Sequence, residues 1–288
     1  RAARRAPDQE QTRRAKALLS RISRALVSRA ERILPADLVR ALVQTDVVVS
    51  DEVPTYAATV FDPGFQAAPV IVANTRALKG LSDEELTAVL AHEMGHVWLR
   101  EAQYTADRLF VEAGDPEVDG ETAQDLRLQS LEILWEIEQR ADVLSVALLR
   151  ELFPSEARSP AAPLQKALER FGSSEIKGYV ESLSEREGLS DRAKAFDVHL
   201  DLDRRQAFLM GVDYRLEGRT LWEAVRHFVE RPWPEAIGIR PIPARRDLTD
   251  LGGIDMSSDH LDLTESGDRL ERSSAAAPAL WTREIEGL

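Results

Sequence analysis

The chain has 288 residues, of which 43% are hydrophobic, enough to fill the core of one large domain. Its formal net charge of -13 argues against a general nucleic-acid binder, because phosphate contacts need clustered Lys and Arg. It contains no cysteine, which excludes disulfides, thiolate zinc sites and cysteine nucleophiles. Any metal site must therefore use His, Asp and Glu.

No stretch of the sequence approaches the eighteen or more apolar residues of a membrane span. The Arg-rich start also lacks the apolar core that a signal peptide needs. The sequence therefore predicts a soluble chain without a transmembrane segment. Because it begins at Arg1 rather than Met, its cellular location stays open, with the cytoplasm slightly favoured.

Residues 1–44 form a basic N-terminal segment, with eleven Lys or Arg and four acids in its first forty residues. Apolar residues recur there at helical spacing, which predicts an amphipathic helix from about Ala15 to Leu34. The favoured interpretation is a helix that packs on the domain with its Arg face in water. Contact with a membrane surface or a partner is the alternative.

The stretch from Asp46 to Thr75 is typical of short strands, because β-branched residues there are separated by Pro and Gly. The expected strands are residues 47–49, 56–61 and 69–72. Asp62-Pro63-Gly64 predicts the turn between the last two.

Helical patterns dominate from Ser82 onward, where Ser82 and Glu85 form a capping box that begins the first helix. Further helices are expected at residues 121–152, 162–171, 174–186, 190–217 and 219–230. The pattern predicts an α+β, predominantly helical domain over residues 45–252, with a small sheet before the capped helix. Residues 253–288 form an acidic tail that contains Ser, Ala and Pro, a composition typical of disordered segments.

The capped helix carries His92-Glu93-Met94-Gly95-His96, an H-E-x-x-H motif. Two His four residues apart share one helix face and can reach one ion about 2 Å away, beside the intervening Glu. With five His in the chain, composition gives roughly a one in a hundred chance of this pattern. It predicts zinc ligands at His92 and His96, and Glu93 as the base that activates the attacking water. Glycine inside a helix costs about 1 kcal/mol of stability relative to alanine, so its presence needs a reason. Gly95 therefore predicts that another backbone passes too close to leave room for a side chain.

The third ligand is expected on the long helix, where Glu138 and Asp142 lie in the middle of an apolar stripe. Buried carboxylates need a cation or strong donors. Glu138 as a zinc ligand and Asp142 as acceptor for a liganding His would satisfy both. The alternative is a structural salt bridge to Arg245 or Arg246.

The interval before this helix contains Gly114-Asp115-Pro116, which predicts a loop near the cleft.

The sequence from Leu81 to Val97, followed by Glu138-Gln139-Arg140-Ala141-Asp142, resembles the gluzincin metallopeptidases that include the CAAX prenyl endopeptidase and the HtpX-type proteases. The resemblance implies a zincin-like domain in which Glu138 is the third ligand of one zinc ion per chain and Asp142 its companion. Two other zincin families, repressor-cleaving bacterial proteases and ubiquitin-activated peptidases, combine similar motifs and predict the same metal site.

Two further segments resemble parts of that family. Residues 69–75 resemble the strand before the active-site helix, which implies that an extended protein or peptide substrate pairs with it. Residues 240–246 resemble a segment that begins His-Pro, but Arg240 stands where the His would be. Arg240 or Arg246 is then the expected cation that stabilises the oxyanion of the reaction.

Together these features predict a zinc metalloendopeptidase with Glu93 as general base. The rival hypothesis is a latent or non-catalytic zinc-stabilised domain that binds peptides or regulates. Glu93 counts against the rival, because a structural site has no use for a base.

Overall fold

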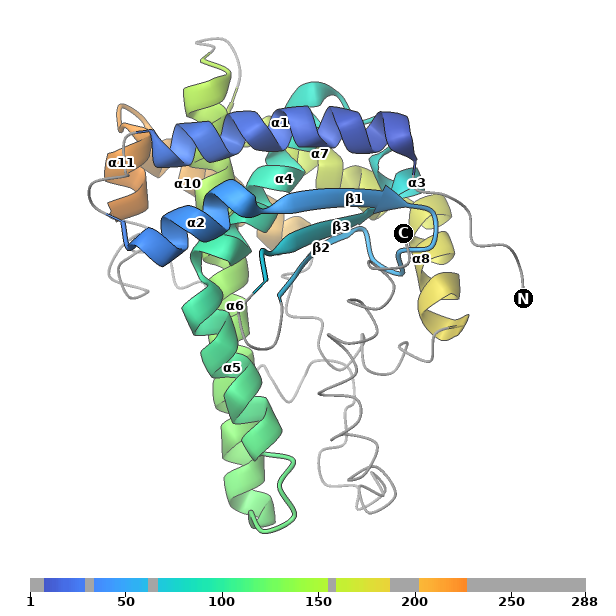
Figure 1. The fold of residues 1–288 in the computed structure, drawn as a ribbon, viewed down its shortest axis with the longest axis vertical. Coiled ribbons are helices and arrows are strands. Elements are labelled where there is room, and N and C mark those ends of the chain that lie inside the picture. Colours follow the sequence, from blue (N-terminus) through green and yellow to red (C-terminus); the bar gives the residue numbers. More distant parts are fainter. Residues whose placement is uncertain (1–7, 29–33, 62–66, 155–158, 187–201, 227–288) are drawn as a thin grey trace.

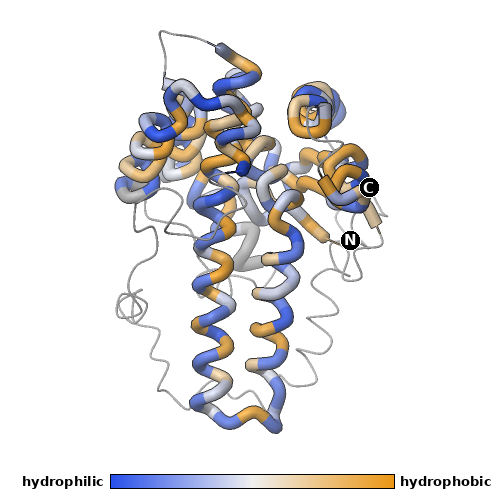
Figure 2. Tube along the Cα trace, turned by 90° about the vertical axis from the view of Figure 1, so that its left-hand side faces the viewer, coloured by the Kyte–Doolittle hydropathy of each residue, from blue (hydrophilic) through white to orange (hydrophobic). Residues whose placement is uncertain are grey.

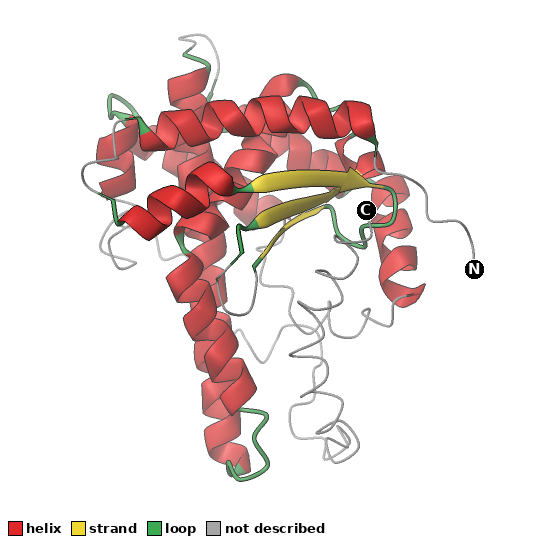
Figure 3. Ribbon diagram, in the orientation of Figure 1, coloured by secondary structure: helices red, strands yellow, loops and turns green. Residues whose placement is uncertain are grey.

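The computed structural model describes residues 8–28, 34–61, 67–154, 159–186 and 202–226 (Figure 1). Most of these residues are helical, and a three-stranded sheet lies among the helices (Figure 3). The strands precede the helix that carries the H-E-x-x-H motif. The predicted α+β, predominantly helical class with a small sheet is therefore confirmed.

The sheet has the order β1-β3-β2, with β1 at Asp46–Ser50, β2 at Ala57–Val60 and β3 at Val70–Asn74. Strand β3 is parallel to β1 and antiparallel to β2, so it is bonded on both sides. The segment at residues 69–75, which was expected to pair with a substrate, is thus an interior strand. The prediction was wrong on this point because β2 pairs with one edge of β3 while β1 pairs with the other.

The N-terminal segment forms α1 (Gln9–Val27) and α2 (Ala36–Gln44), and both contribute to the main core. Helix α1 lies along α4 and β1 in Figure 1 and buries its apolar side, including Leu19 and Ile22. This confirms the favoured interpretation of a helix packed on the domain. What α1 exposes is mainly polar and includes Arg13, Lys16 and Arg21. The segment boundaries at residues 44 and 252 remain predictions.

The active-site helix is α4 (Asp83–Trp98), which follows the short α3 (Thr75–Leu78). Its capping box is present: Ser82 Oγ accepts from the Glu85 N–H and the Glu85 carboxylate accepts from the Ser82 N–H. Gly80 makes the tight turn before it with φ +85°, a conformation that residues with a Cβ rarely adopt. From Leu86 to Gly95 every residue of α4 is buried, so both faces of this helix are packed.

Helices α5 (Arg100–Glu112) and α6 (Gly120–Leu152) form a long antiparallel hairpin whose distal part projects from the body (Figure 1). Polar and apolar residues alternate along this arm, as Figure 2 shows. The loop with Gly114 joins the two helices at the tip, roughly 27 Å along α6 from Glu138 at 1.5 Å per residue. The prediction of a loop near the cleft was therefore wrong. None of the described helices is long and apolar enough to span a bilayer.

The remaining described helices are α7 (Ala162–Phe171), α8 (Ser174–Arg186), α10 (Leu202–Leu216) and α11 (Leu221–Ala224). Helix α7 packs on α4, whereas α10 and α11 pack on α6. The first two match the predicted helices at 162–171 and 174–186. Helices α10 and α11 confirm helix within the segments predicted at 190–217 and 219–230. Residues 190–201 and 227–230 of these segments, and the whole tail at 253–288, lie outside the described residues.

Candidate metal centre

Helices α4 and α6 cross closely because small residues meet at the crossing. A Cβ placed on Gly95 would lie 2.6 Å from the Cα of Ala141, so only glycine fits there without a shift of the backbone. Further along the crossing, the Ser145 hydroxyl donates to the carbonyl oxygen of Ala88 at 2.8 Å. The close passage of a second backbone at Gly95 is confirmed, and it brings Glu138 within reach of the two histidines.

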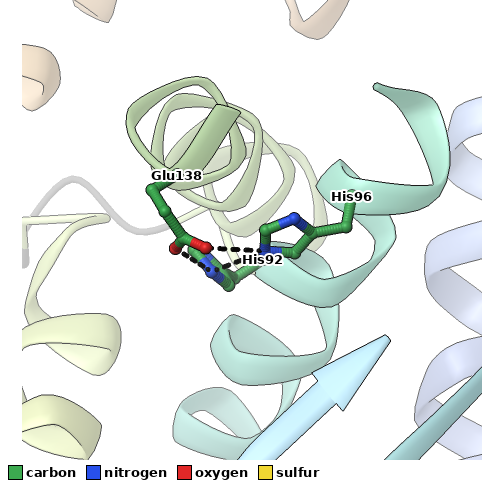
Figure 4. A group of neighbouring side chains, drawn as sticks. All are labelled: His92, His96 and Glu138. Carbon is green, nitrogen blue, oxygen red and sulfur yellow. Dashed lines mark hydrogen bonds and ion pairs between the residues drawn. The ribbon is translucent and has the colours of Figure 1, made fainter. Parts of the chain in front are cut away.

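His92, His96 and Glu138 form one cluster, in which the carboxylate from α6 faces both imidazoles from α4 (Figure 4). The two Nε2 atoms are 3.2 Å apart. The Glu138 oxygens lie 3.2 Å from His92 Nε2 and 3.5 Å from His96 Nε2. The structure therefore brings together the three residues that the sequence predicted as ligands.

These separations fit a tetrahedral zinc ion. Zinc binds His nitrogens and carboxylate oxygens at about 2.0 to 2.2 Å, and the edge of such a tetrahedron is about 3.3 to 3.6 Å. The Nε2–Nε2 separation of 3.2 Å is close to that edge, as are the 3.2 and 3.5 Å from His92 and His96 to the two different oxygens of Glu138. One donor atom from each residue lies within 4.8 Å of the others. Two His and one carboxylate are also a donor set of catalytic zinc sites, which keep the fourth position open.

Asp142 lies one turn beyond Glu138 on α6, and its Oδ1 is 2.9 Å from Nδ1 of His92. Burial alone would raise the pKa of Asp142, but Arg205 and His92 outweigh that effect and hold the pKa at about 2. The ionised carboxylate can only accept, so His92 donates its Nδ1–H to it. With Nδ1 bonded to Asp142, Nε2 is the nitrogen directed at the cluster, where a metal ion would displace its proton.

Arg205 on α10 is a residue of the site that the sequence analysis missed. Its Nε donates to Asp142 Oδ2 at 2.8 Å and its Nη2 to Asp142 Oδ1 at 2.7 Å. Burial would lower the pKa of Arg205, but Asp142, Glu138 and Glu93 raise it above its ordinary value. The sequence did contain a signal, since Arg205 lies at helical spacing with the buried Leu209.

The charges of the cluster also favour a divalent cation. In the described structure the carboxylates of Glu93, Glu138 and Asp142 are coupled to Arg205, so carboxylates outnumber the cations of the cluster even when His92 is protonated. Burial would lower the pKa of His92, yet Asp142 and Glu138 raise it to about 9. Buried charges need compensation. A zinc ion with two neutral histidines would balance this excess, so the residues present fit the metal.

Glu93 is buried beside the cluster but is not one of its three donors. Its Oε2 accepts a hydrogen bond of 2.8 Å from the hydroxyl of Thr59 on β2. The sequence analysis missed Thr59, because no pattern in the sequence distinguishes a threonine that reaches the site from any other threonine in a short strand. Arg240 and Arg246, the expected cations for the oxyanion, lie outside the described residues.

Residues 22–113 match the model of Peptidase family M48. The matched segment includes the whole sheet and the H-E-x-x-H helix and ends before Glu138. No curated protein and no solved structure matches the chain. The match of residues 22–113 to a peptidase family and the cluster of His92, His96 and Glu138 identify the chain as a metallopeptidase, a hydrolase with a candidate zinc site.

Proposed function

We propose that the chain is an endopeptidase of the CAAX prenyl endopeptidase and HtpX type that uses one zinc ion, held by His92, His96 and Glu138. The observation that carries the proposal is the meeting of their donor atoms: the two Nε2 atoms are 3.2 Å apart, and the two oxygens of Glu138 lie 3.2 and 3.5 Å from them, close enough for one zinc ion. Glu93, adjacent to His92 in the chain, is the proposed general base.

Zinc in this position supplies Lewis acidity, which lowers the pKa of a water molecule and polarises a peptide carbonyl. Glu93 accepts a proton from the attacking water while the oxygen forms its bond to the carbonyl carbon. It then delivers that proton to the leaving nitrogen as the C–N bond breaks. Asp142, held by Arg205, keeps His92 in the tautomer that presents Nε2 to the metal.

The proposed substrate is a protein or peptide in extended conformation along β2. The N–H of Asn74 donates to the carbonyl oxygen of Tyr56 at 3.0 Å, so the backbone of Tyr56 faces β3. Because successive residues of a strand point their backbone groups to opposite sides, those of Ala57 and Thr59 face away from β3. In the described part of the chain, no strand pairs with that second edge of β2. A substrate strand added there would follow residues next to the Glu93 contact.

The test is zinc content together with cleavage of an unfolded protein, measured on the wild type, Glu138→Ala, Glu93→Gln and Glu136→Ala. Glu136 is a matched control, because it lies on the same helix and pairs with Arg140 instead of the cluster. We expect about one zinc per chain in the wild type, its loss in Glu138→Ala, and its retention without cleavage in Glu93→Gln. Glu136→Ala should keep both.

Two other outcomes would change the assignment. Zinc without cleavage in the wild type would favour the latent or non-catalytic zinc-stabilised domain. A properly folded wild type that takes up no zinc would contradict the proposed site altogether.

A further inference from the structure

We propose that Thr59 is a positioning residue that holds the carboxylate of Glu93 in place through both proton transfers of the reaction. This inference rests on the proposed function, in which Glu93 is the general base. It begins from an unusual placement: a hydroxyl on the outer strand β2 reaches a buried carboxylate on the active-site helix α4.

The contact is short and has two acceptors. Thr59 Oγ1 lies 2.8 Å from Glu93 Oε2 and 2.9 Å from the backbone carbonyl oxygen of Glu93. A threonine hydroxyl has one hydrogen to donate and can also accept. In the part of the chain that the structure describes, Thr59 is the side chain that hydrogen-bonds the Glu93 carboxylate. A valine of the same shape would leave this buried carboxylate without that donor.

The two acceptors let the same hydroxyl serve Glu93 with and without its proton. While Glu93 is ionised, Thr59 donates to Oε2. After the water has given its proton to Oε1 and bonded to the carbonyl carbon, Oε2 is still an acceptor, so Thr59 keeps donating to Oε2 or turns its hydrogen to the Glu93 carbonyl. The proton on Oε1 is then available to move to the leaving nitrogen as the C–N bond breaks. The side chain stays anchored throughout.

Thr59 also connects the base to the proposed substrate strand. Its side chain contacts Glu93, while its backbone N–H and C=O face the second edge of β2. A peptide paired with β2 would therefore be held by the residue that holds the base. A peptide held there would be placed relative to the Glu93 carboxylate through one residue, and general-base catalysis needs such a fixed relation between the reacting groups.

The experiment compares Thr59→Val, Thr59→Ser and Thr87→Val with the wild type. Thr87 is the matched control, because its hydroxyl donates to the Asp83 carbonyl on the same helix as Glu93 and contacts nothing in the cluster. We expect Thr59→Val to lower kcat about 10-fold or more, as loss of a hydrogen bond to a charged group does. KM and zinc content should stay unchanged, Thr59→Ser should recover most of kcat, and Thr87→Val should keep it.

A crystal structure of Thr59→Val provides a readout other than activity, since the Glu93 carboxylate should leave its present position or occupy more than one. An unchanged kcat in Thr59→Val, or a Thr59→Ser no more active than Thr59→Val, would overturn the role. Failure of the proposed function looks different, because it would appear as cleavage that survives Glu93→Gln or needs no zinc. In that case Thr59 would have no base to position and the inference would fall with it.

Discussion

Asp142 and His92 face each other across the crossing of α6 and α4, with 2.9 Å between Oδ1 and Nδ1. The hydrogen bond fixes which nitrogen of His92 is directed at Glu138 and His96. It joins the two helices at the point where the metal ligands meet. A change at Asp142 should therefore alter metal binding although Asp142 is not a ligand.

Asp142→Asn keeps the shape of the side chain and removes its charge. The amide accepts less strongly from His92 and leaves Arg205 without the carboxylate to which it donates two hydrogen bonds. We expect zinc affinity to fall about 10-fold to 100-fold, as for other residues that orient metal ligands. A competition assay with a zinc chelator measures this, with Asp125→Asn, an exposed position on the same helix, as control. Equal affinities in the two variants would contradict the orienting role.

Arg205→Met tests the other side of that ion pair. Removing the guanidinium leaves Asp142 buried and charged, and breaking a buried pair in this way costs about 3 to 5 kcal/mol of the free energy of unfolding. Urea denaturation of the zinc-free protein measures the loss without any contribution from the metal. Arg215→Met, at an exposed position on the same helix, should change stability by about 0.5 kcal/mol or less.

Zinc itself should stabilise the fold, because the described cluster holds an excess of carboxylates over cations. A ligand that binds only the folded state adds about 4.1 kcal/mol at a thousand times its dissociation constant. Adding zinc to the zinc-free protein should therefore raise Tm with increasing concentration. The same titration of Glu138→Ala should show little change. A Tm that does not respond to zinc in the wild type would contradict the charge argument.

Local patterns were enough to predict the centre of the site. The capping box at Ser82, the spacing of His92 and His96, and two carboxylates on an apolar stripe each depend on a few neighbouring residues in one helix. The structure confirms the start of α4 at the capping box, the helix expected at 121–152 and the meeting of His92, His96 and Glu138. Such features are visible in the sequence because helical periodicity places residues on a known face.

The parts that the sequence did not reveal depend on tertiary pairing. Strand β2 folds back onto β3 and takes the edge that was assigned to the substrate, a choice that strand composition cannot make. Arg205 reaches Asp142 from a helix 63 residues away in the chain. The loop at Gly114 lies at the tip of an arm because α5 and α6 pair along their lengths. Each of these features is set by which elements pack together.

At the crossing of α4 and α6, replacing Gly95 by alanine should lower the stability of the fold. The same replacement at Gly178, away from the crossing, should raise it. Gly95→Ala places a methyl group 2.6 Å from the Cα of Ala141, which is backbone and cannot move without separating α4 from α6. Overpacking of this kind costs about 1 to 3 kcal/mol, more than the roughly 1 kcal/mol that alanine gains in a helix. We therefore expect Gly95→Ala to unfold at lower urea concentration and to bind zinc more weakly.

Gly178→Ala is the matched control, since Gly178 also lies inside a helix, α8, and a Cβ there would meet nothing within 4 Å. Without a clash, only the helix propensity remains, so this variant should gain about 0.5 to 1 kcal/mol. Urea denaturation of both variants measures the contrast. If Gly95→Ala were as stable as Gly178→Ala, the backbones of α4 and α6 would have to lie farther apart than described. Glu138 would then lose the closeness to His92 and His96 on which the metal centre depends.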